Sequence, residues 1–248
     1  MNVIVTFAVR SELAPWLRLR TFRRMAVKGW TSYETTIAGT AVHAVLTGIG
    51  PSHAKEAIRV ALGSRPDAVL ASGLAGALKP SFGVGDVLAA RLVHFDRTDQ
   101  HVSSSEELLD LAIECGAKAV DSFISGNTIA RTAEEKAVLG SLAEAVDMES
   151  FAILTEARRS GVPAIALRSV ADTSECDLPC DFSKMVDERG RMRMWRMALE
   201  PICAPQRVPA LIRLALASHR AASRLARFLD RYLEVLAETR EHWRFPQL

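Results

Sequence analysis

The stretch that decides the fold class is residues 145–172, AVDMESFAILTEARRSGVPAIALRSVAD. It opens with a short apolar run and continues into a helical segment over Ser150 to Arg159. Gly161 to Pro163 then form a helix stop. The run from Ala164 to Val170 that follows is almost entirely apolar, which is typical of a strand buried on both faces. This order predicts a strand, a helix and a second strand.

The same alternation extends over residues 1 to about 172. Further strand-like runs are Val3 to Ala8, Val42 to Leu46, Ala68 to Ala71, Val87 to Val93 and Ala119 to Ile124. Helical stretches are predicted at His53 to Leu62 and at Ala133 to Leu142. Short buried strands that alternate with helices predict an α/β fold with a mainly parallel sheet and right-handed crossovers.

The pattern changes after Asp172. Turn residues fill positions 173–190, and a short helix around Met192 to Leu199 and a joint at Pro201 to Pro205 follow. A long helical run then covers about Pro209 to Glu238. Residues 181–248 hold 13 Lys and Arg against 8 Asp and Glu, a surplus of +5. We therefore expect a main domain over residues 1–180 and a helical C-terminal extension over residues 181–248, packed on the same domain.

Composition excludes several classes of protein. The 248 residues are 49% hydrophobic and 24% charged, which is ordinary globular composition. The net charge of +2 predicts no nucleic-acid partner. Four cysteines are too few for a disulfide framework, and we expect reduced thiols and no metal site. The sequence shows no signal peptide and no apolar run of spanning length, so we expect a cytoplasmic protein.

Glycines and carboxylates follow the predicted strands, where ligands bind in open parallel sheets. The glycine-rich stretches are Thr47 to Pro51 and Ser72 to Ala77, expected as turns that bring backbone amides close to a ligand. The carboxylates that follow strands are Glu12, Glu149 and Asp172. Partial burial there raises a carboxyl pKa and suits acid–base chemistry. The alternatives for each acid are helix capping or a solvated turn; for Asp147 and Glu149, a first-turn position in a helix is a further alternative.

The ordered motifs FAVRSEL, TGIG, ASGLAGAL, VGDV, ISGNT, AVDMES and RSVADT resemble the nucleoside phosphorylase and nucleosidase superfamily. The nearest branch is that of the 5′-methylthioadenosine/S-adenosylhomocysteine nucleosidases. The resemblance implies a three-layer fold over residues 1–180, with a central mixed sheet flanked by helices. It also implies catalytic roles for three residues: Glu149 binds the ribose hydroxyls, Asp172 protonates the departing purine at N7, and Glu12 activates water.

The resemblance also implies the residues that bind substrate. They are Ile49, Gly73, Leu74, Asn127, Ile129, Asp147, Met148 and Arg168, with Met148 packed on the sugar. Three of them depart from the family pattern. Leu74 replaces a small polar residue, Asn127 stands in place of Asp, and Ile129 stands in place of a base-stacking aromatic residue. The identity of the base therefore stays open.

The nucleophile is water or inorganic phosphate. Phosphorylases of this superfamily place an Arg two residues before the strand-end glycine and a Ser or Thr after it, whereas this chain has Ala71 and Leu74. Without that Arg and that hydroxyl group, a phosphate dianion would be poorly paired, and this favours water as the nucleophile. Arg10 and Arg168 are the remaining candidates for anion binding, although the role we favour for Arg168 is to orient Glu12 or Glu149 by a salt bridge. No cofactor is expected, apart from phosphate as cosubstrate in a phosphorylase.

The C-terminal run Leu211 to Leu236 is amphipathic, with apolar residues at helical spacing and arginines between them. It either packs on the domain or a partner subunit, or contacts an anionic membrane. Together with the segments LPCDF and DERGRMR it resembles the hopanoid-associated nucleosidase/phosphorylase branch, which cleaves adenosylhopane.

The sequence thus predicts a purine nucleosidase that hydrolyses a 5′-substituted adenosine-type nucleoside. The alternatives are a phosphate-dependent phosphorylase, an adenosylhopane-cleaving enzyme and a non-catalytic nucleoside-binding protein. A homo-oligomer, with a dimer favoured, is expected from the resemblance.

Overall fold

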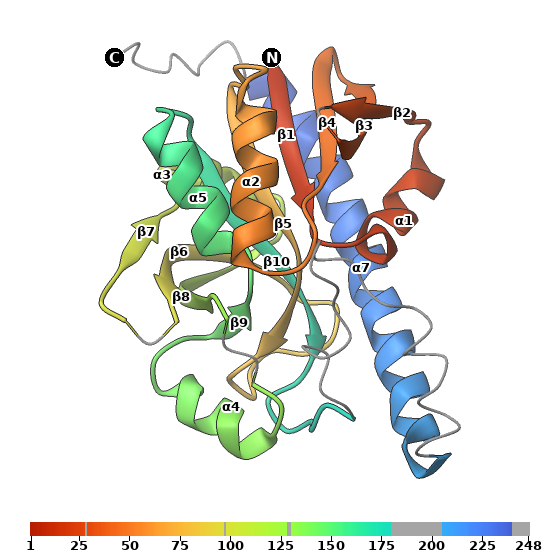
Figure 1. The fold of residues 1–248 in the computed structure, drawn as a ribbon, viewed down its shortest axis with the longest axis vertical. Helices are drawn as coiled ribbons and strands as arrows, with labels where there is room; N and C mark the ends of the chain where they lie inside the picture. Colours follow the sequence, from red (N-terminus) through yellow and green to blue (C-terminus); the bar gives the residue numbers. More distant parts are fainter. Residues whose placement is uncertain (28, 97, 128–129, 180–204, 240–248) are drawn as a thin grey trace.

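The computed structural model describes residues 1–179 and 205–239, apart from positions 28, 97, 128 and 129. The predicted helix around 192–199 lies outside this part of the chain. One large sheet forms the centre, and helices cover both of its faces (Figure 1).

The sheet is mixed, with equal use of parallel and antiparallel neighbours. Its strands are β1 (Asn2–Phe7), β2 (Arg23–Val27), β3 (Trp30–Ile37), β4 (Thr40–Leu46), β5 (Ala68–Ala77), β6 (Val87–Phe95), β7 (His101–Ser103), β8 (Lys118–Ser125), β9 (Ala145–Asp147) and β10 (Ala164–Asp172). The parallel pairs are β1–β4, β1–β5, β5–β10, β6–β8 and β8–β9. The β2–β3–β4 meander and the β5–β9, β6–β7 and β6–β10 pairs are antiparallel. The mixed sheet is confirmed, and the mainly parallel sheet that the alternation predicted is wrong.

Two helical layers complete the fold. The helices are α1 (Arg10–Leu19), α2 (Pro51–Leu62), α3 (Glu106–Glu114), α4 (Ala133–Gly140), α5 (Ser150–Arg159) and α7 (Val208–Glu238), with a short 3₁₀ turn at Pro205–Arg207. Helices α1, α3 and α7 share one apolar core with β1, β5 and β10, and α2 and α5 pack on the opposite face. Helix α4 lies at the end of the sheet where β5 and β10 finish (Figure 1).

The second half of α7 belongs to the core of the main domain. Leu225, Leu229 and Leu236 are buried, and the buried Tyr232 hydroxyl donates to the Leu108 carbonyl at 2.9 Å. Trp16 Nε1 donates to Asp230, and Arg20 is ion-paired with Asp230 and Glu234. These contacts brace α1, the helix that carries Glu12, against α7.

The pairing of strand β5 is interrupted along one of its edges, and the site lies beside this interruption. Residues Ala68–Ala71 pair with β1, and Gly76 and Ala77 pair with β9, while β10 pairs along the other side from Val69 to Gly76. The four residues 72–75 therefore lie between the end of β1 and the start of β9. The expected turn at Ser72 to Ala77 is wrong: this stretch is the second half of a strand whose neighbour changes.

Candidate active site

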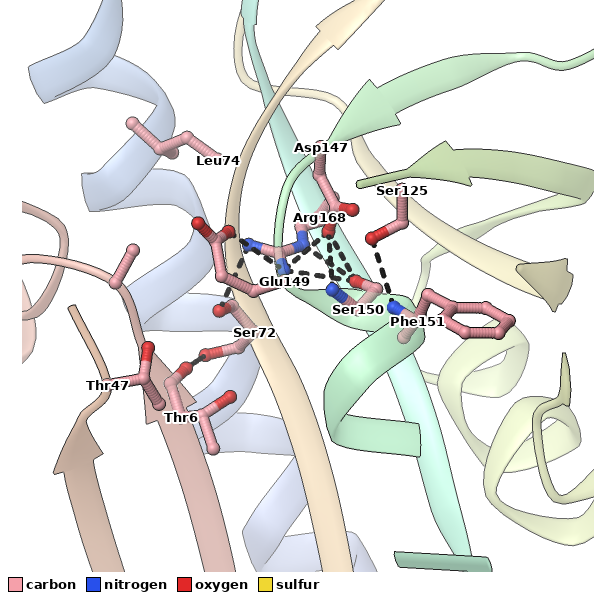
Figure 2. Close-up of polar contacts among 12 residues, drawn as sticks. Thr6, Thr47, Ser72, Leu74, Ser125, Asp147, Glu149, Ser150, Phe151 and Arg168 are labelled. Atoms are coloured by element: carbon pink, nitrogen blue, oxygen red, sulfur yellow. Dashed lines mark hydrogen bonds and ion pairs between the residues drawn. The ribbon is translucent and has the colours of Figure 1, made fainter. Parts of the chain in front are cut away.

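Arg168 is the centre of a buried polar cluster beside this interruption (Figure 2). It comes from β10 and is only 1% exposed. Its guanidinium is ion-paired with Asp147 at 2.5 Å and with Glu149 at 3.6 Å. It also donates to the Ser150 hydroxyl at 3.0 and 3.1 Å and to the Ser72 carbonyl at 3.3 Å. A guanidinium held at several points fixes the carboxylates around it.

Gly73 leaves the space that the Arg168 guanidinium occupies. A Cβ on Gly73 would lie 2.1 Å from Arg168 Nη1 and 3.4 Å from Glu12 Oε2. Any larger residue would therefore displace the guanidinium, so glycine is needed for the Arg168 side chain to approach the backbone this closely.

Glu12 is buried in the first turn of α1, directly after β1. Its carboxylate accepts hydrogen bonds from the backbone N–H groups of Ala8 at 2.9 Å and Leu74 at 3.3 Å. Burial raises the pKa of Glu12, and the nearby Arg168 and these backbone donors oppose the rise. Glu12 is thus a rigidly held carboxylate with a raised proton affinity, which is the property a general base needs near neutral pH.

Glu149 is the N-cap residue of α5 and links three elements. Its Oε1 accepts from the Gly50 N–H at 2.8 Å, in the loop after β4, and its Oε2 faces Arg168. Burial is the main cause that raises the pKa of Glu149 to about 7; Arg168 lowers it, and Asp147 raises it further. The neighbouring Asp147 accepts from Ser150 as well as from Arg168.

Asp172 ends β10, as predicted, and is separated from Val170 by a register shift. Its side chain is 12% exposed and lies against Gly76, where a Cβ would meet Oδ2 at 3.0 Å. Burial raises the pKa of Asp172, and the ammonium group of Lys136 opposes the rise.

Lys136, on α4, is a site residue that the sequence analysis missed, as is Ser150 in the cluster around Arg168. Lys136 is fully buried, and its Nζ donates to Asp172 Oδ2 at 2.5 Å and to the carbonyls of Thr173 at 2.8 Å and Cys176 at 2.7 Å. These three acceptors match the three N–H groups of an ammonium. The sequence could have indicated its burial, because Lys136 lies three residues before Leu139 and seven before Ala143, at the helical spacing of buried positions.

The other predicted site residues divide by position. Met148 and Leu74 are half-buried beside Glu149 and Glu12, and Ile49 is half-buried next to Gly50. Asn127 is exposed just after β8, and Ile129 lies outside the described residues. Arg10 is exposed at the start of α1.

The charges in this site favour a cationic ligand group over an anionic one. Three carboxylates, Glu12, Asp147 and Glu149, surround Arg168, the one buried guanidinium among the described residues. A centre of positive charge is stabilised there, whereas a dianion meets like charge. Asp172 forms a second acidic position, separated from the first along residues 72–76 of β5.

The family follows from a match over most of the chain. A family model described as the Phosphorylase superfamily matches residues 3–199, and the chain belongs to this family. The match extends beyond residue 180, into the segment that the sequence assigned to the extension; the boundary at residue 180 stays a prediction.

Individual relatives are more distant. The 5′-methylthioadenosine/S-adenosylhomocysteine nucleosidase of Staphylococcus saprophyticus is 28% identical over 147 residues, which cover 50% of this chain and 64% of that protein. The chain therefore matches less than two thirds of that relative's length. The solved nucleosidase of the same description from Helicobacter pylori, in complex with butyl-thio-DADMe-Immucillin-A, has a TM-score of 0.74 and 19% identity, covering 95% of this chain and 98% of that chain. The futalosine hydrolase of Helicobacter pylori has the same TM-score and coverage at 20% identity. These structures establish the fold.

Proposed function

We propose that this protein is a purine nucleosidase that hydrolyses the N-glycosidic bond of a 5′-substituted adenosine-type nucleoside. The observation that carries the proposal is the excess of buried carboxylates around Arg168. Cleavage of this bond develops positive charge on the sugar, as in glycoside hydrolysis. Buried carboxylates stabilise that charge, and no metal is needed.

Each carboxylate has one role in the proposed reaction. Glu12 removes a proton from the attacking water, and Glu149 binds the ribose hydroxyls and faces the developing cation. Asp172 donates a proton to the departing base, so that the base leaves neutral. Arg168 and Asp147 act as positioning residues because their contacts hold Glu149 and Ser150.

Water is preferred to phosphate for an electrostatic reason. Arg168 is neutralised by Asp147 and Glu149, and Arg10 is exposed. The Leu74 N–H, a potential anion donor, is bonded to Glu12. A phosphorylase remains the alternative, in which Arg10 or Arg168 would have to bind phosphate.

The names of relatives and the side chain of Leu74 support the proposed base and 5′ group of the substrate. Relatives named for methylthioadenosine, S-adenosylhomocysteine and futalosine support a nucleoside with a substituted 5′ carbon. A half-buried Leu74 beside Glu12 makes this part of the site more apolar. Adenosylhopane, whose 5′ group is a lipid, is the second candidate, and a non-catalytic nucleoside-binding protein is the alternative of another class.

The substrate is tested by measuring release of free base in phosphate-free buffer. The panel is methylthioadenosine, S-adenosylhomocysteine, 5′-deoxyadenosine, inosine and adenosylhopane in detergent. We expect release of adenine from at least one 5′-substituted adenosine and none from inosine. Binding of these nucleosides without any release would favour the non-catalytic alternative.

Lys136→Met is expected to move the pH dependence of the reaction. An opposite charge at this distance lowers an Asp pKa by about 1–3 units, so its removal raises the pKa of Asp172. The alkaline limb of the kcat/KM profile should therefore move to higher pH by that amount, and Lys136→Arg should leave it near its wild-type position. If Lys136 were only structural, Lys136→Met would lower activity equally at every pH.

Assembly and location are further parts of the proposal. We expect a homo-oligomer, with a dimer favoured, in the cytoplasm. Size-exclusion chromatography with light scattering tests the subunit count.

A further inference from the structure

The first half of α7 is exposed, in contrast to the second half. The buried residues of this helix all lie at Ala221 or beyond. Residues 208–220, roughly 20 Å of helix, extend past the core along the side of the molecule (Figure 1). Leu211 and Leu214 are only half-buried and Ala215 is exposed, although all three lie in the run that the sequence predicts as amphipathic.

The outward side of α7 combines two kinds of residue. Ile212 is 55% exposed and Leu216 is 65% exposed, the highest value among the large hydrophobic residues described as exposed. Arg220 and Arg224 continue the same four-residue spacing and so lie on the same side of the helix. We name this side, with the exposed Arg213, Arg227 and Arg231, the outward stripe.

The charge on this part of the helix has one sign. Residues 208–229 contain four arginines, at 213, 220, 224 and 227, and no Asp or Glu. The acidic residues of α7 begin at Asp230, where Asp230 and Glu234 are paired with Arg20. Among charged side chains, the part of α7 before Asp230 thus carries only cationic ones, and the acidic residues follow in the part of the helix that is paired with α1.

We infer that the outward stripe of α7 docks the protein on an anionic lipid membrane. Ile212 and Leu216 would enter the boundary between headgroups and acyl chains, and the arginines would contact lipid phosphates. Exposed Ile and Leu side chains between the arginines favour lipid over nucleic acid, whose phosphates offer them no apolar contact. The docking is peripheral: among the described residues no helix is both long and apolar enough to cross a membrane.

This docking is independent of the proposed reaction and is measured without it. Sucrose-loaded vesicles of phosphatidylcholine alone, or mixed with phosphatidylglycerol, are sedimented with the full chain. We expect binding to the anionic vesicles only, and weaker binding as salt is added. The pair Arg220→Gln and Arg227→Gln should lower the partition coefficient about thirtyfold. The pair Ile212→Ser and Leu216→Ser should lower it at least tenfold.

Matched controls separate the stripe from general surface properties. Val138 and Leu142 are 59% and 56% exposed with the same spacing, so Val138→Ser with Leu142→Ser should leave binding unchanged. Arg91→Gln with Arg158→Gln, two exposed arginines elsewhere, should do the same. The inference is wrong if the wild-type chain binds both vesicle types equally or neither, or if the controls lose as much binding. A change of oligomeric state in the stripe variants, without vesicle binding by the wild type, would make the stripe a subunit interface instead.

Discussion

Asp172→Asn is expected to lower kcat/KM for a purine nucleoside by about 10²–10⁴-fold, the usual contribution of a general acid. The amide keeps an oxygen that can accept from Lys136 Nζ, so the contacts of β10 and α4 are retained. What is lost is the proton that neutralises the departing base. Steady-state kinetics with the best substrate of the nucleoside panel measure this loss.

A leaving group that needs no proton separates this role from a structural one. A p-nitrophenyl riboside releases a stable phenolate, so Asp172→Asn should cleave it nearly as fast as the wild type. Equal losses on the purine nucleoside and on the p-nitrophenyl riboside would contradict the assignment of Asp172 as the acid. An unchanged purine rate would contradict it as well.

Glu149→Gln is expected to lower kcat/KM at least 10³-fold on both kinds of substrate. The amide can still accept from the Gly50 N–H, but it carries no charge to face the sugar cation. In the wild type, activity should fall as the pH drops below about 7, because the Glu149 carboxyl, whose pKa is raised to about 7, becomes neutral. This acid limb should be reduced in the variant.

The same variant should melt at a higher temperature than the wild type at pH 8. A carboxyl whose pKa is higher in the folded state binds more protons there than in the unfolded state. The free energy of unfolding therefore falls as the pH rises toward the folded-state pKa. Removing the charge relieves this cost at pH 8, and the difference should shrink at pH 5. Normal turnover by Glu149→Gln, or a large loss of stability at pH 8, would show that Glu149 has another role.

The positions of the acids could be predicted because the ends of buried strands are visible in the sequence. The helix Ser150 to Arg159 and the strand from Ala164 were predicted closely, and they place Glu149 and Asp172. Glu12 was expected after the first strand, and it lies in the turn of α1 that follows β1.

The features that could not be predicted depend on contacts between distant segments. Pairing is interrupted beside residues 72–75 because β1 ends and β9 begins along one edge of β5. The apolar pattern of β5 does not show this, because it is the same whether the strand has one neighbour or two. Hairpin β2–β3 consists of RRMAV and WTSYETTI, which lack a continuous apolar run. Lys136 was missed because its acceptors lie near residues 172–176, far from α4 in the chain.

The most direct test of the account is the sugar product of the wild-type enzyme. The best nucleoside of the panel is incubated with and without inorganic phosphate, and the products are separated by mass. We expect free base and the free 5-substituted ribose in both buffers, at equal rates, because the cluster of Glu12, Asp147 and Glu149 around Arg168 disfavours a dianion. A phosphate-dependent rate with ribose 1-phosphate as product would contradict this account.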